Sequence, residues 1–480
     1  MKQSANITLS IMSFKARLIA HLPQWARDCE EIVRAFNPYL IIDNQSQEYL
    51  KIDCLQELQI KISSSFAPDY TQDFIINCTD ILQYKRLYKR YAKNAIYKYL
   101  SNFLGISLPY GSATGVRPTA LVRNATKGEG KVGYLVNNYF IEPKRAQLLV
   151  KTVESQAGYI SYDKSEIDFY INIPFCPTRC NYCSFISTEM HRVASRLEDY
   201  VNAICYEAKR AMQYVADNKK KIRCIYIGGG TPTCLPYRLL ERLLRPFSDK
   251  AKEFCVEAGR PDTLDNNILR LFQQYGVTRV SINPQSLNDN TLQKIGRSHS
   301  VADFYQAYEQ ACAFNFIKNT DIILGLPGEN SQDIARTIEG ILALRPENIT
   351  VHTLALKRGG RLKEAATKAD FMPIKEIADR VIEIFDKSGY LPYYIYRQKN
   401  MIDALENIGY MQAGKPCLYN IDIMEETHSI IGLGAGAMTK SVQDKLIARH
   451  NSPKDINYYL ARLDDNLEKK IDLLQGRQEE

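Results

Sequence analysis

The sequence predicts an α/β fold: a partial (β/α)6 barrel that follows an N-terminal α+β domain and precedes a small C-terminal appendage. From about residue 168, short apolar runs alternate with amphipathic stretches, as strands and helices do in parallel sheets. Residues before about 160 lack this alternation, and beyond about 390 it becomes irregular. We therefore expect an accessory domain over 1–160, the core over 165–390 and a family-specific region over 391–480.

The N-terminal region combines predicted strands and helices. Apolar runs predict strands over 7–14 and 49–62, the second being one long strand or a hairpin. Apolar residues at helical spacing predict helices over 24–36, 81–104 and 144–155. The polar stretch 154–165 is expected to link this region to the core.

The predicted helix around 84–99 mixes tyrosines with lysines and arginines, a composition that can bind RNA by stacking and charge. One helical face, however, is shared by Tyr84, Leu87, Tyr88, Tyr91 and Ala95, and the charges fall largely elsewhere. This separation favours an amphipathic core helix over a nucleic-acid site.

The core region contains six predicted strand–helix units. Its strands are expected over 168–173, 223–227, 254–257, 279–282, 321–324 and 349–354. Its helices are expected over 197–214, 237–244, 264–275, 301–314, 331–344 and 374–387. Right-handed crossovers join such units into a partial barrel or an open sheet. In both arrangements, ligands bind at the carboxyl ends of the strands.

Composition narrows the class of protein. A chain of 480 residues exceeds one ordinary core, and 45% hydrophobic with 24% charged residues is typical of globular proteins. The net charge of +8 fits a solvated surface, or an acidic partner such as nucleic acid or a carboxylate ligand. No apolar run is long enough to span a membrane and no signal-peptide core is found, so we expect a cytoplasmic protein.

Three of the 12 cysteines lie within eight positions, directly after the first core strand. Cys176, Cys180 and Cys183 have the spacing C-x3-C-x2-C. Three thiolates on one loop can bind three corners of a [4Fe–4S] cluster, and the missing fourth cysteine leaves one iron open. The amino and carboxylate groups of S-adenosylmethionine (SAM) can chelate an open iron. A structural zinc site and three buried cysteines are the alternatives, although zinc sites usually carry paired C-x2-C or Cys/His sets.

A glycine-rich turn, Gly228–Gly229–Gly230 with Thr231, follows the second core strand. Glycines let the backbone approach a ligand closely, and exposed N–H and C=O groups can bind a methionine amino group. A plain tight turn is the alternative. Its place one strand–helix unit after the cysteine loop favours ligand binding.

The cysteine loop resembles the signature of the radical SAM superfamily. Together with the glycine turn and further segments, the chain resembles the oxygen-independent coproporphyrinogen III oxidase family, and within it the HemZ-type branch. Those segments are 256–261, 281–286, 295–297, 321–328, 352–358, 394–400 and 431–437, and with less force 108–111 and 115–119. The resemblance implies a [4Fe–4S] cluster, reductive cleavage of SAM and removal of a hydrogen atom from the substrate by the resulting radical.

The resemblance also implies which residues contact SAM. Tyr182 would lie near the adenine, Arg297 would pair with the SAM carboxylate, and polar groups at strand ends would bind the ribose. The full implied set is Tyr170, Tyr182, Gly229, Gly230, Thr231, Glu257, Gln285, Arg297, Asp321 and Ala355. Taken singly, Glu257 could also be a solvated strand end and Arg297 a surface ion pair. No catalytic residue is assigned.

The family reaction would make the substrate coproporphyrinogen III, a tetrapyrrole with carboxylate side chains, and the product protoporphyrinogen IX. Lys357, Arg358 and Arg397 are candidate carboxylate partners. The electron donor and acceptor are unidentified, and nucleic acid is the less favoured partner.

Two positions depart from the coproporphyrinogen dehydrogenases. Phe185 stands where they carry a further cysteine, and Asn172 where they carry a histidine. The Cys-x-Phe ending resembles the haem-chaperone branch. Three functions therefore stay open: porphyrinogen decarboxylation, haem binding and delivery with the cluster retained, and radical SAM chemistry on another substrate, including RNA.

Overall fold

A computed structural model of the chain describes residues 14–37, 40–55, 59–125, 130–183, 188–356, 372–444 and 446–477. The chain divides into two compact units. Unit 1 comprises residues 1–150 with 397–405, and unit 2 comprises 151–396 with 406–480.

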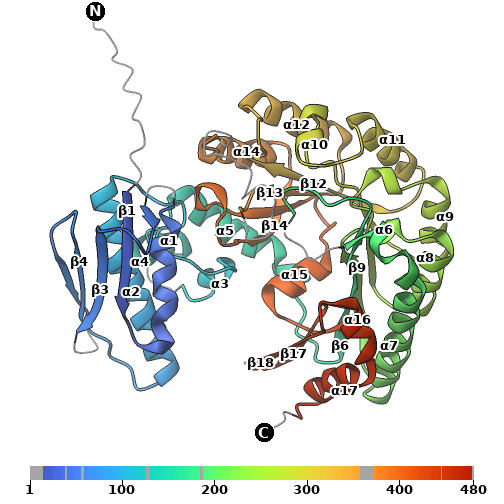
Figure 1. Cartoon of the computed structure of the whole chain (residues 1–480), viewed down its shortest axis with the longest axis horizontal. Coiled ribbons are helices and arrows are strands. Elements are labelled where there is room, and N and C mark those ends of the chain that lie inside the picture. The colour runs from blue at the N-terminus through green and yellow to red at the C-terminus, as the bar shows by residue number, and fades with distance from the viewer. Residues whose placement is uncertain are drawn as a thin grey trace, which may run out of the picture. The chain divides into compact units, whose positions relative to one another are not determined.

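Unit 1 is built on a five-stranded sheet with the order β2-β1-β3-β4-β5 (Figure 1). The strands are β1 (Phe14–His21), β2 (Leu40–Ile42), β3 (Tyr49–Leu55), β4 (Gln59–Ser64) and β5 (Tyr70–Asp73). β1 is parallel to both of its neighbours, and β3, β4 and β5 form an antiparallel meander. The segment 49–62 is therefore a hairpin. Of the strand expected over 7–14, only Phe14 lies within the described residues, and β1 begins there.

The helices of this part of the chain begin with η1 (Gln24–Glu30) and α1 (Glu31–Ala35). They continue with α2 (Ile81–Leu104), α3 (Thr119–Val122), α4 (Lys131–Tyr139) and α5 (Pro143–Gln156). The Asp80 side chain accepts from the Gln83 N–H at 2.8 Å at the start of α2, and Gly105 ends the helix in the left-handed conformation. The buried face of α2 includes Tyr88, Ala92, Ala95, Ile96 and Leu100, as expected of a core helix.

The main sheet of unit 2 has six parallel strands at its centre. In spatial order these are β6 (Glu166–Ile173), β9 (Lys221–Gly229), β10 (Glu253–Glu257), β11 (Arg279–Ser281), β12 (Ile317–Leu324) and β13 (Asn348–Thr353). Adjacent strands among these six pair in parallel, which is the arrangement predicted for a (β/α)6 core.

Residues 391–480 extend both edges of this sheet. β14 (Leu391–Tyr396) and β15 (Asn407–Met411) add antiparallel strands beyond β13. At the other edge β16 (Ser429–Leu433) pairs in parallel with β6, followed by β17 (Met438–Gln443) and β18 (Leu446–Asn451). The sheet has 11 strands, and among the described residues its two edges do not pair. The region expected as an appendage therefore completes the core sheet.

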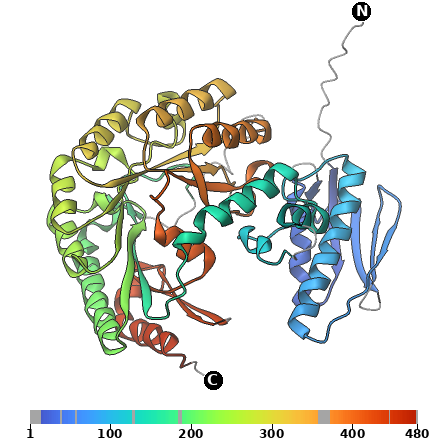
Figure 2. The ribbon, with the colours of Figure 1, turned by 180° about the vertical axis from the view of Figure 1, so that it is seen from behind.

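The helices that follow the parallel strands lie on the outer side of the curved sheet, and α15 lies on its inner side (Figures 1 and 2). The outer helices are α7 (Leu197–Asp217), α8 (Tyr237–Leu244), α9 (Asn266–Gln274), α11 (Val301–Cys312), α12 (Ser331–Leu344) and α14 (Lys375–Lys387). The inner helix α15 spans Leu418–Glu425. Shorter helices are α6 (Met190–Val193) and α10 (Asp289–Lys294), and α16 (Ile456–Ala461) and α17 (Leu463–Leu474) end the chain.

Local capping explains why two helices begin where the sequence places them. Ser300 with Asp303, and Asn330 with Asp333, form reciprocal capping boxes at the starts of α11 and α12. Among the described residues, we find no helix that combines the length and apolar character needed to cross a bilayer.

Candidate functional site

The cysteine loop begins directly after β6, at the carboxyl end of the parallel sheet. Its first residues form β7 (Phe175–Cys176), which pairs in parallel with β8 (Thr188–Glu189). Asn181 fastens the loop to the end of α10, because its backbone N–H donates to Ile295 O at 2.9 Å and its amide donates to Lys294 O at 2.9 Å. All three cysteines are partly exposed thiols, so a metal cluster can reach them.

Two of these sulfurs each have a hydrogen-bond donor beside them. Arg260 Nη1 lies 3.8 Å from Cys180 Sγ, and Asp262 accepts from Arg260 Nε at 3.2 Å. The Thr231 hydroxyl donates to Cys176 Sγ at 3.6 Å. A guanidinium and a hydroxyl so placed stabilise negative charge on sulfur, and the thiolate is the form that binds metal.

The glycine turn packs against the start of the cysteine loop. Gly229 has φ +108°, and a Cβ there would overlap Asn172 Oδ1. A Cβ on Gly230 would overlap Phe175 O, and the Gly230 N–H donates to Ile173 O at 2.8 Å. The two glycines are therefore required for the close approach of β9 to the loop, whatever the turn binds.

Two carboxyl groups at this end of the sheet differ in protonation. Burial raises the pKa of Glu257 to about 7, although the carboxyl accepts from Tyr226 Oη at 2.6 Å. Burial also opposes ionisation of Asp321, but His352 and Asn319 outweigh it and hold the Asp321 pKa below its ordinary value. Near neutral pH, Asp321 is thus ionised while Glu257 is partly protonated.

Gln285 has a left-handed backbone with φ +69°, which is unfavourable for a residue with a side chain by roughly 1–2 kcal/mol. Its backbone is held against β12, because its N–H donates to Asp321 O at 3.1 Å and its carbonyl accepts from Ile323 N at 2.9 Å. The side-chain Oε1 is buried and lacks a hydrogen-bond partner among the described residues. The fold thus holds a strained residue with an unused acceptor beside Asp321.

Arg297 joins the cysteine loop to the strand ends. Nη2 donates to Tyr182 Oη at 3.0 Å, and Nη1 donates to Gly259 O at 2.7 Å and Asn283 O at 3.3 Å. Its buried Nε has no partner in the part of the chain that the structure describes. Arg297 is therefore a buried residue that links these segments and not part of a surface ion pair. Its Nε–H can donate to a further acceptor.

The remaining expected SAM contacts lie at the margins of this group. Tyr170 stacks with Tyr226 and Tyr419, at centroid distances of 6.3 and 6.2 Å, and donates to Asn172 Oδ1 at 3.2 Å. Ala355 is half-buried just beyond β13, and the hydrogen bonds described here do not connect it to the other nine.

The suggested carboxylate partners do not belong to this group of residues. Lys357 and Arg358 lie outside the described residues, as does Phe185, the residue two positions after Cys183. Arg397 belongs to unit 1, where it donates to the carbonyls of Ala113, Leu405 and Ala404 and stacks over Tyr110. Its guanidinium organises backbone within unit 1.

Sequence reasoning missed several residues that shape the site. Arg260 lies beside Cys180, Tyr226 binds Glu257, and His352 Nε2 lies 3.6 Å from Asp321 Oδ2. Arg260 and His352 stand within segments that carried the resemblance, so their position next to strand ends was the available signal. Tyr226 gave none, because it is one apolar-looking residue within a strand.

Comparisons with known proteins show which family the chain belongs to. The Radical SAM superfamily model matches residues 170–341. The chain is 34% identical to the oxygen-independent coproporphyrinogen-III oxidase-like protein HemZ of Bacillus subtilis (strain 168), over 85% of this chain and 84% of that protein. The chain belongs to the oxygen-independent coproporphyrinogen-III oxidase-like family.

The chain is also similar to a heme chaperone and to a solved structure. The heme chaperone HemW of Bacillus subtilis (strain 168) is 33% identical over 39% of this chain, and the match spans about half of that relative, 50%. Among solved structures, coproporphyrinogen III oxidase (HemN) from Escherichia coli, described as a radical SAM enzyme, aligns with a TM-score of 0.52. That alignment has 18% identity and covers 65% of this chain and 72% of the other, so it supports the fold.

Radical SAM proteins use a [4Fe–4S] cluster and SAM, and the residues of this site fit both groups. The three reachable thiols offer a purely sulfur donor set with no fourth cysteine on the loop. The unused polar atoms Gln285 Oε1 and Arg297 Nε suit a polar cosubstrate beside them.

Proposed function

We propose that this oxidase-like family member is an enzyme that converts two propionate groups of coproporphyrinogen III into vinyl groups, with loss of CO2. The observation that carries the proposal is the extent of the relationship to the oxidase-like protein HemZ. It spans 85% of the chain, well beyond the residues 170–341 common to the superfamily, and so includes the regions that would select a substrate.

Cys176, Cys180 and Cys183 would hold the cluster through three of its irons, with SAM on the fourth. When bound, these groups supply the one-electron chemistry that removes a hydrogen atom from an unactivated carbon. The residues proposed to contact SAM are Tyr170, Tyr182, Gly229, Gly230, Thr231, Glu257, Gln285, Arg297, Asp321 and Ala355.

The chain's own groups have separable tasks in this proposal. Asp321, ionised through its contacts with His352 and Asn319, would accept from a ribose hydroxyl. Glu257, with a pKa of about 7, can accept as a carboxylate or donate as an acid. The stacked rings of Tyr170, Tyr226 and Tyr419 would keep water from the inner side of the sheet.

Haem binding and delivery is the second candidate, and two observations favour it. The heme chaperone HemW matches part of the chain, and Phe185 follows the last cysteine as in that branch. Asn172, at the position of a histidine in the dehydrogenases, donates to Ala435 O at 2.6 Å and accepts from Tyr170. A side chain with both contacts in place serves to pack the loop after β16 against β6.

An anaerobic assay separates the candidates. Protein with its cluster reconstituted would be incubated with coproporphyrinogen III, SAM and a low-potential reductant. Vinyl products with stoichiometric 5′-deoxyadenosine support the proposal, and a Cys180→Ala variant should form neither. Tight haem binding without any porphyrinogen turnover would favour the second candidate. Cleavage of SAM with neither outcome would mean that another substrate is used.

A further inference from the structure

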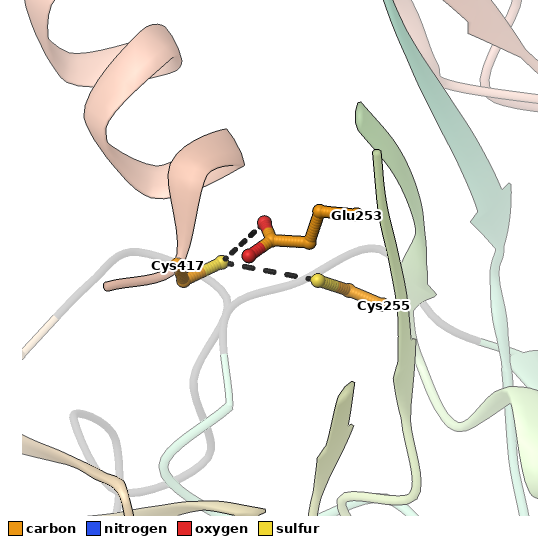
Figure 3. Close-up of side chains that lie close together, drawn as sticks. All are labelled: Glu253, Cys255 and Cys417. Atoms are coloured by element: carbon orange, nitrogen blue, oxygen red, sulfur yellow. Dashed lines mark hydrogen bonds between the residues drawn. The ribbon is translucent and has the colours of Figure 1, made fainter. Parts of the chain in front are cut away.

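A second group of cysteines lies on the inner face of the unit 2 sheet, at the opposite ends of the strands from the candidate site. Glu253 begins β10 and Cys255 stands two residues later, so both side chains point to the same face. Cys417 comes from the residue before α15, the helix on that inner side. All three are buried, and Figure 3 shows their sulfur and oxygen atoms directed at one another.

Two separations among these atoms match the edges of a tetrahedral metal site. Cys417 Sγ lies 3.9 Å from Cys255 Sγ and 3.4 Å from Glu253 Oε1 (Figure 3). Zinc–sulfur bonds of about 2.3 Å and zinc–oxygen bonds of about 2.0 Å place tetrahedral ligands about 3.8 Å (S to S) and about 3.5 Å (S to O) apart. The ligand atoms of all three residues lie within 4.8 Å of one another, so an ion could contact all three after a side-chain adjustment. A disulfide would need the sulfurs to approach to about 2.05 Å.

We propose that Cys255, Cys417 and Glu253 form a binding site for a thiophilic divalent cation of the zinc type, distinct from the cluster on the cysteine loop. The ion would join β10 to the segment that carries α15.

The charges around the site support a divalent ion. Arg279 Nη2 donates to the second carboxylate oxygen, Glu253 Oε2, at 3.1 Å, and the guanidinium is itself buried. Two thiolates and one carboxylate carry three negative charges, which a divalent ion and Arg279 balance. Without an ion, Arg279 is the cation that pairs with the Glu253 carboxylate.

Hydrogen bonds from neighbouring groups hold the Glu253 carboxylate in place, as is usual for metal ligands. Arg279 orients the carboxylate, as hydrogen-bonded partners of metal ligands do, and the Tyr419 N–H donates to Glu253 Oε1 at 3.2 Å. Cys224, across from Glu253 on β9, lies near Asp422 instead, with its Sγ 3.8 Å from Asp422 Oδ2. We do not count Cys224 among the ligands.

The metal site is connected to the candidate functional site through two stacked tyrosine rings. Tyr419, two residues after Cys417, stacks on Tyr226 at a centroid distance of 4.6 Å, and Tyr226 donates to Glu257. An ion that fixes Cys417 would therefore also fix the ring that supports Glu257.

The test uses the full chain with Cys176, Cys180 and Cys183 replaced by alanine, so that no iron cluster contributes. We expect about one zinc per chain by elemental analysis after dialysis, and thiolate-to-metal charge-transfer absorption with tetrahedral d–d bands after cobalt substitution. Adding Cys255→Ala or Cys417→Ser should abolish both signals. Glu253→Gln should weaken zinc binding by at least 10-fold. Cys205→Ala, a half-buried thiol on α7, should leave them unchanged.

Two results would overturn the proposal. One is the absence of bound zinc and of cobalt bands in the folded parent protein, a measurement that does not depend on any Cys255 or Cys417 variant folding. The other is a Cys255–Cys417 disulfide detected by mass spectrometry in protein prepared without oxygen. Neither result would overturn the proposed activity, because the cluster ligands of the cysteine loop are not part of this site.

Discussion

Arg297 donates a 3.0 Å hydrogen bond from its guanidinium to the phenol oxygen of Tyr182, a residue of the cysteine loop. Arg297 comes from the segment after α10, and its other amino group donates to the carbonyls of Gly259 and Asn283, which follow β10 and β11. One buried cation thus ties the cysteine loop to two strand ends. Because Tyr182 stands directly before Cys183, the orientation of the loop depends on this contact.

Arg297→Lys should weaken SAM binding and loosen the cysteine loop. A lysine ammonium keeps the charge but cannot span Tyr182, Gly259 and Asn283 together, so at least one buried acceptor loses its donor. We expect a loss of about 1–3 kcal/mol in the free energy of unfolding and roughly a 10-fold weaker dissociation constant for SAM. Isothermal titration and urea unfolding measure the two effects. Arg270→Lys, an exposed residue of α9, is the control, and equal SAM affinity in both variants would refute this role.

Gly230→Ala should displace the cysteine loop. The new Cβ would overlap Phe175 O, and backbone cannot yield as a flexible side chain can. Such overpacking typically costs about 1–3 kcal/mol, and here the strain falls next to Cys176. Thermal unfolding and iron content after reconstitution should both fall.

Gly158→Ala is the matched control, because a Cβ at that position meets nothing within 4 Å. Its melting temperature should stay the same or rise slightly. If Gly230→Ala retained full iron content and stability, the close packing of the glycine turn on the loop would not matter.

Glu257 should give the unfolding free energy a pH dependence. Its folded pKa of about 7 exceeds its ordinary value of 4.5, so the folded state binds the proton more tightly. The stability from this proton is fully present below about pH 4.5 and is lost as the pH rises to about 7, by roughly 1–3 kcal/mol. Glu257→Gln should remove that fall.

The measurement is urea unfolding of the wild type and Glu257→Gln at pH 5 and pH 7.5. The difference in stability between the two proteins should change with pH in the stated direction. Glu339→Gln, an exposed position on α12, should show the pH dependence of the wild type. A Glu257→Gln protein with the same slope as the wild type would contradict the raised pKa.

Cys180→Ala should abolish the iron–sulfur cluster without unfolding the chain. The side chain is partly exposed and its loop keeps the Asn181 anchors to the end of α10. Reconstituted wild-type protein should hold about four iron and four sulfide per chain, and the variant close to none. Cys312→Ala, an exposed thiol on α11, is the control. Full iron content in Cys180→Ala would place the metal elsewhere.

Much of the core was predictable because each parallel unit has a local signal. Helix α12 begins and ends at the residues predicted, since Asn330 and Asp333 form its capping box within the sequence itself. Strand β12 was expected only from Asp321, and it begins four residues earlier, at Ile317, because the pairing of Arg279 with Ile317 extends it. The ends of a strand are set by pairing with residues that are distant in the sequence. A local sequence pattern does not carry information about those partners.

The candidate site shows the same division. Cys176, Cys180 and Cys183 are recognisable from spacing, because three ligands on one loop need no tertiary information. The contact of Arg260 with Cys180 and the stacking of Tyr226 on Tyr419 join segments 80 and 193 residues apart, and no spacing rule predicts them.

The sequence by itself determined the alternation of strands and helices, the cysteine loop and the family resemblance, because each is encoded within a few consecutive residues. Only the tertiary structure decided that residues 391–480 complete both edges of the sheet and that Cys417 meets Cys255. It also decided that Arg397 bonds within unit 1 and that burial raises the pKa of Glu257 to about 7. These properties depend on burial and on neighbours brought together by the closing of long loops, and so they arise only when the whole chain folds.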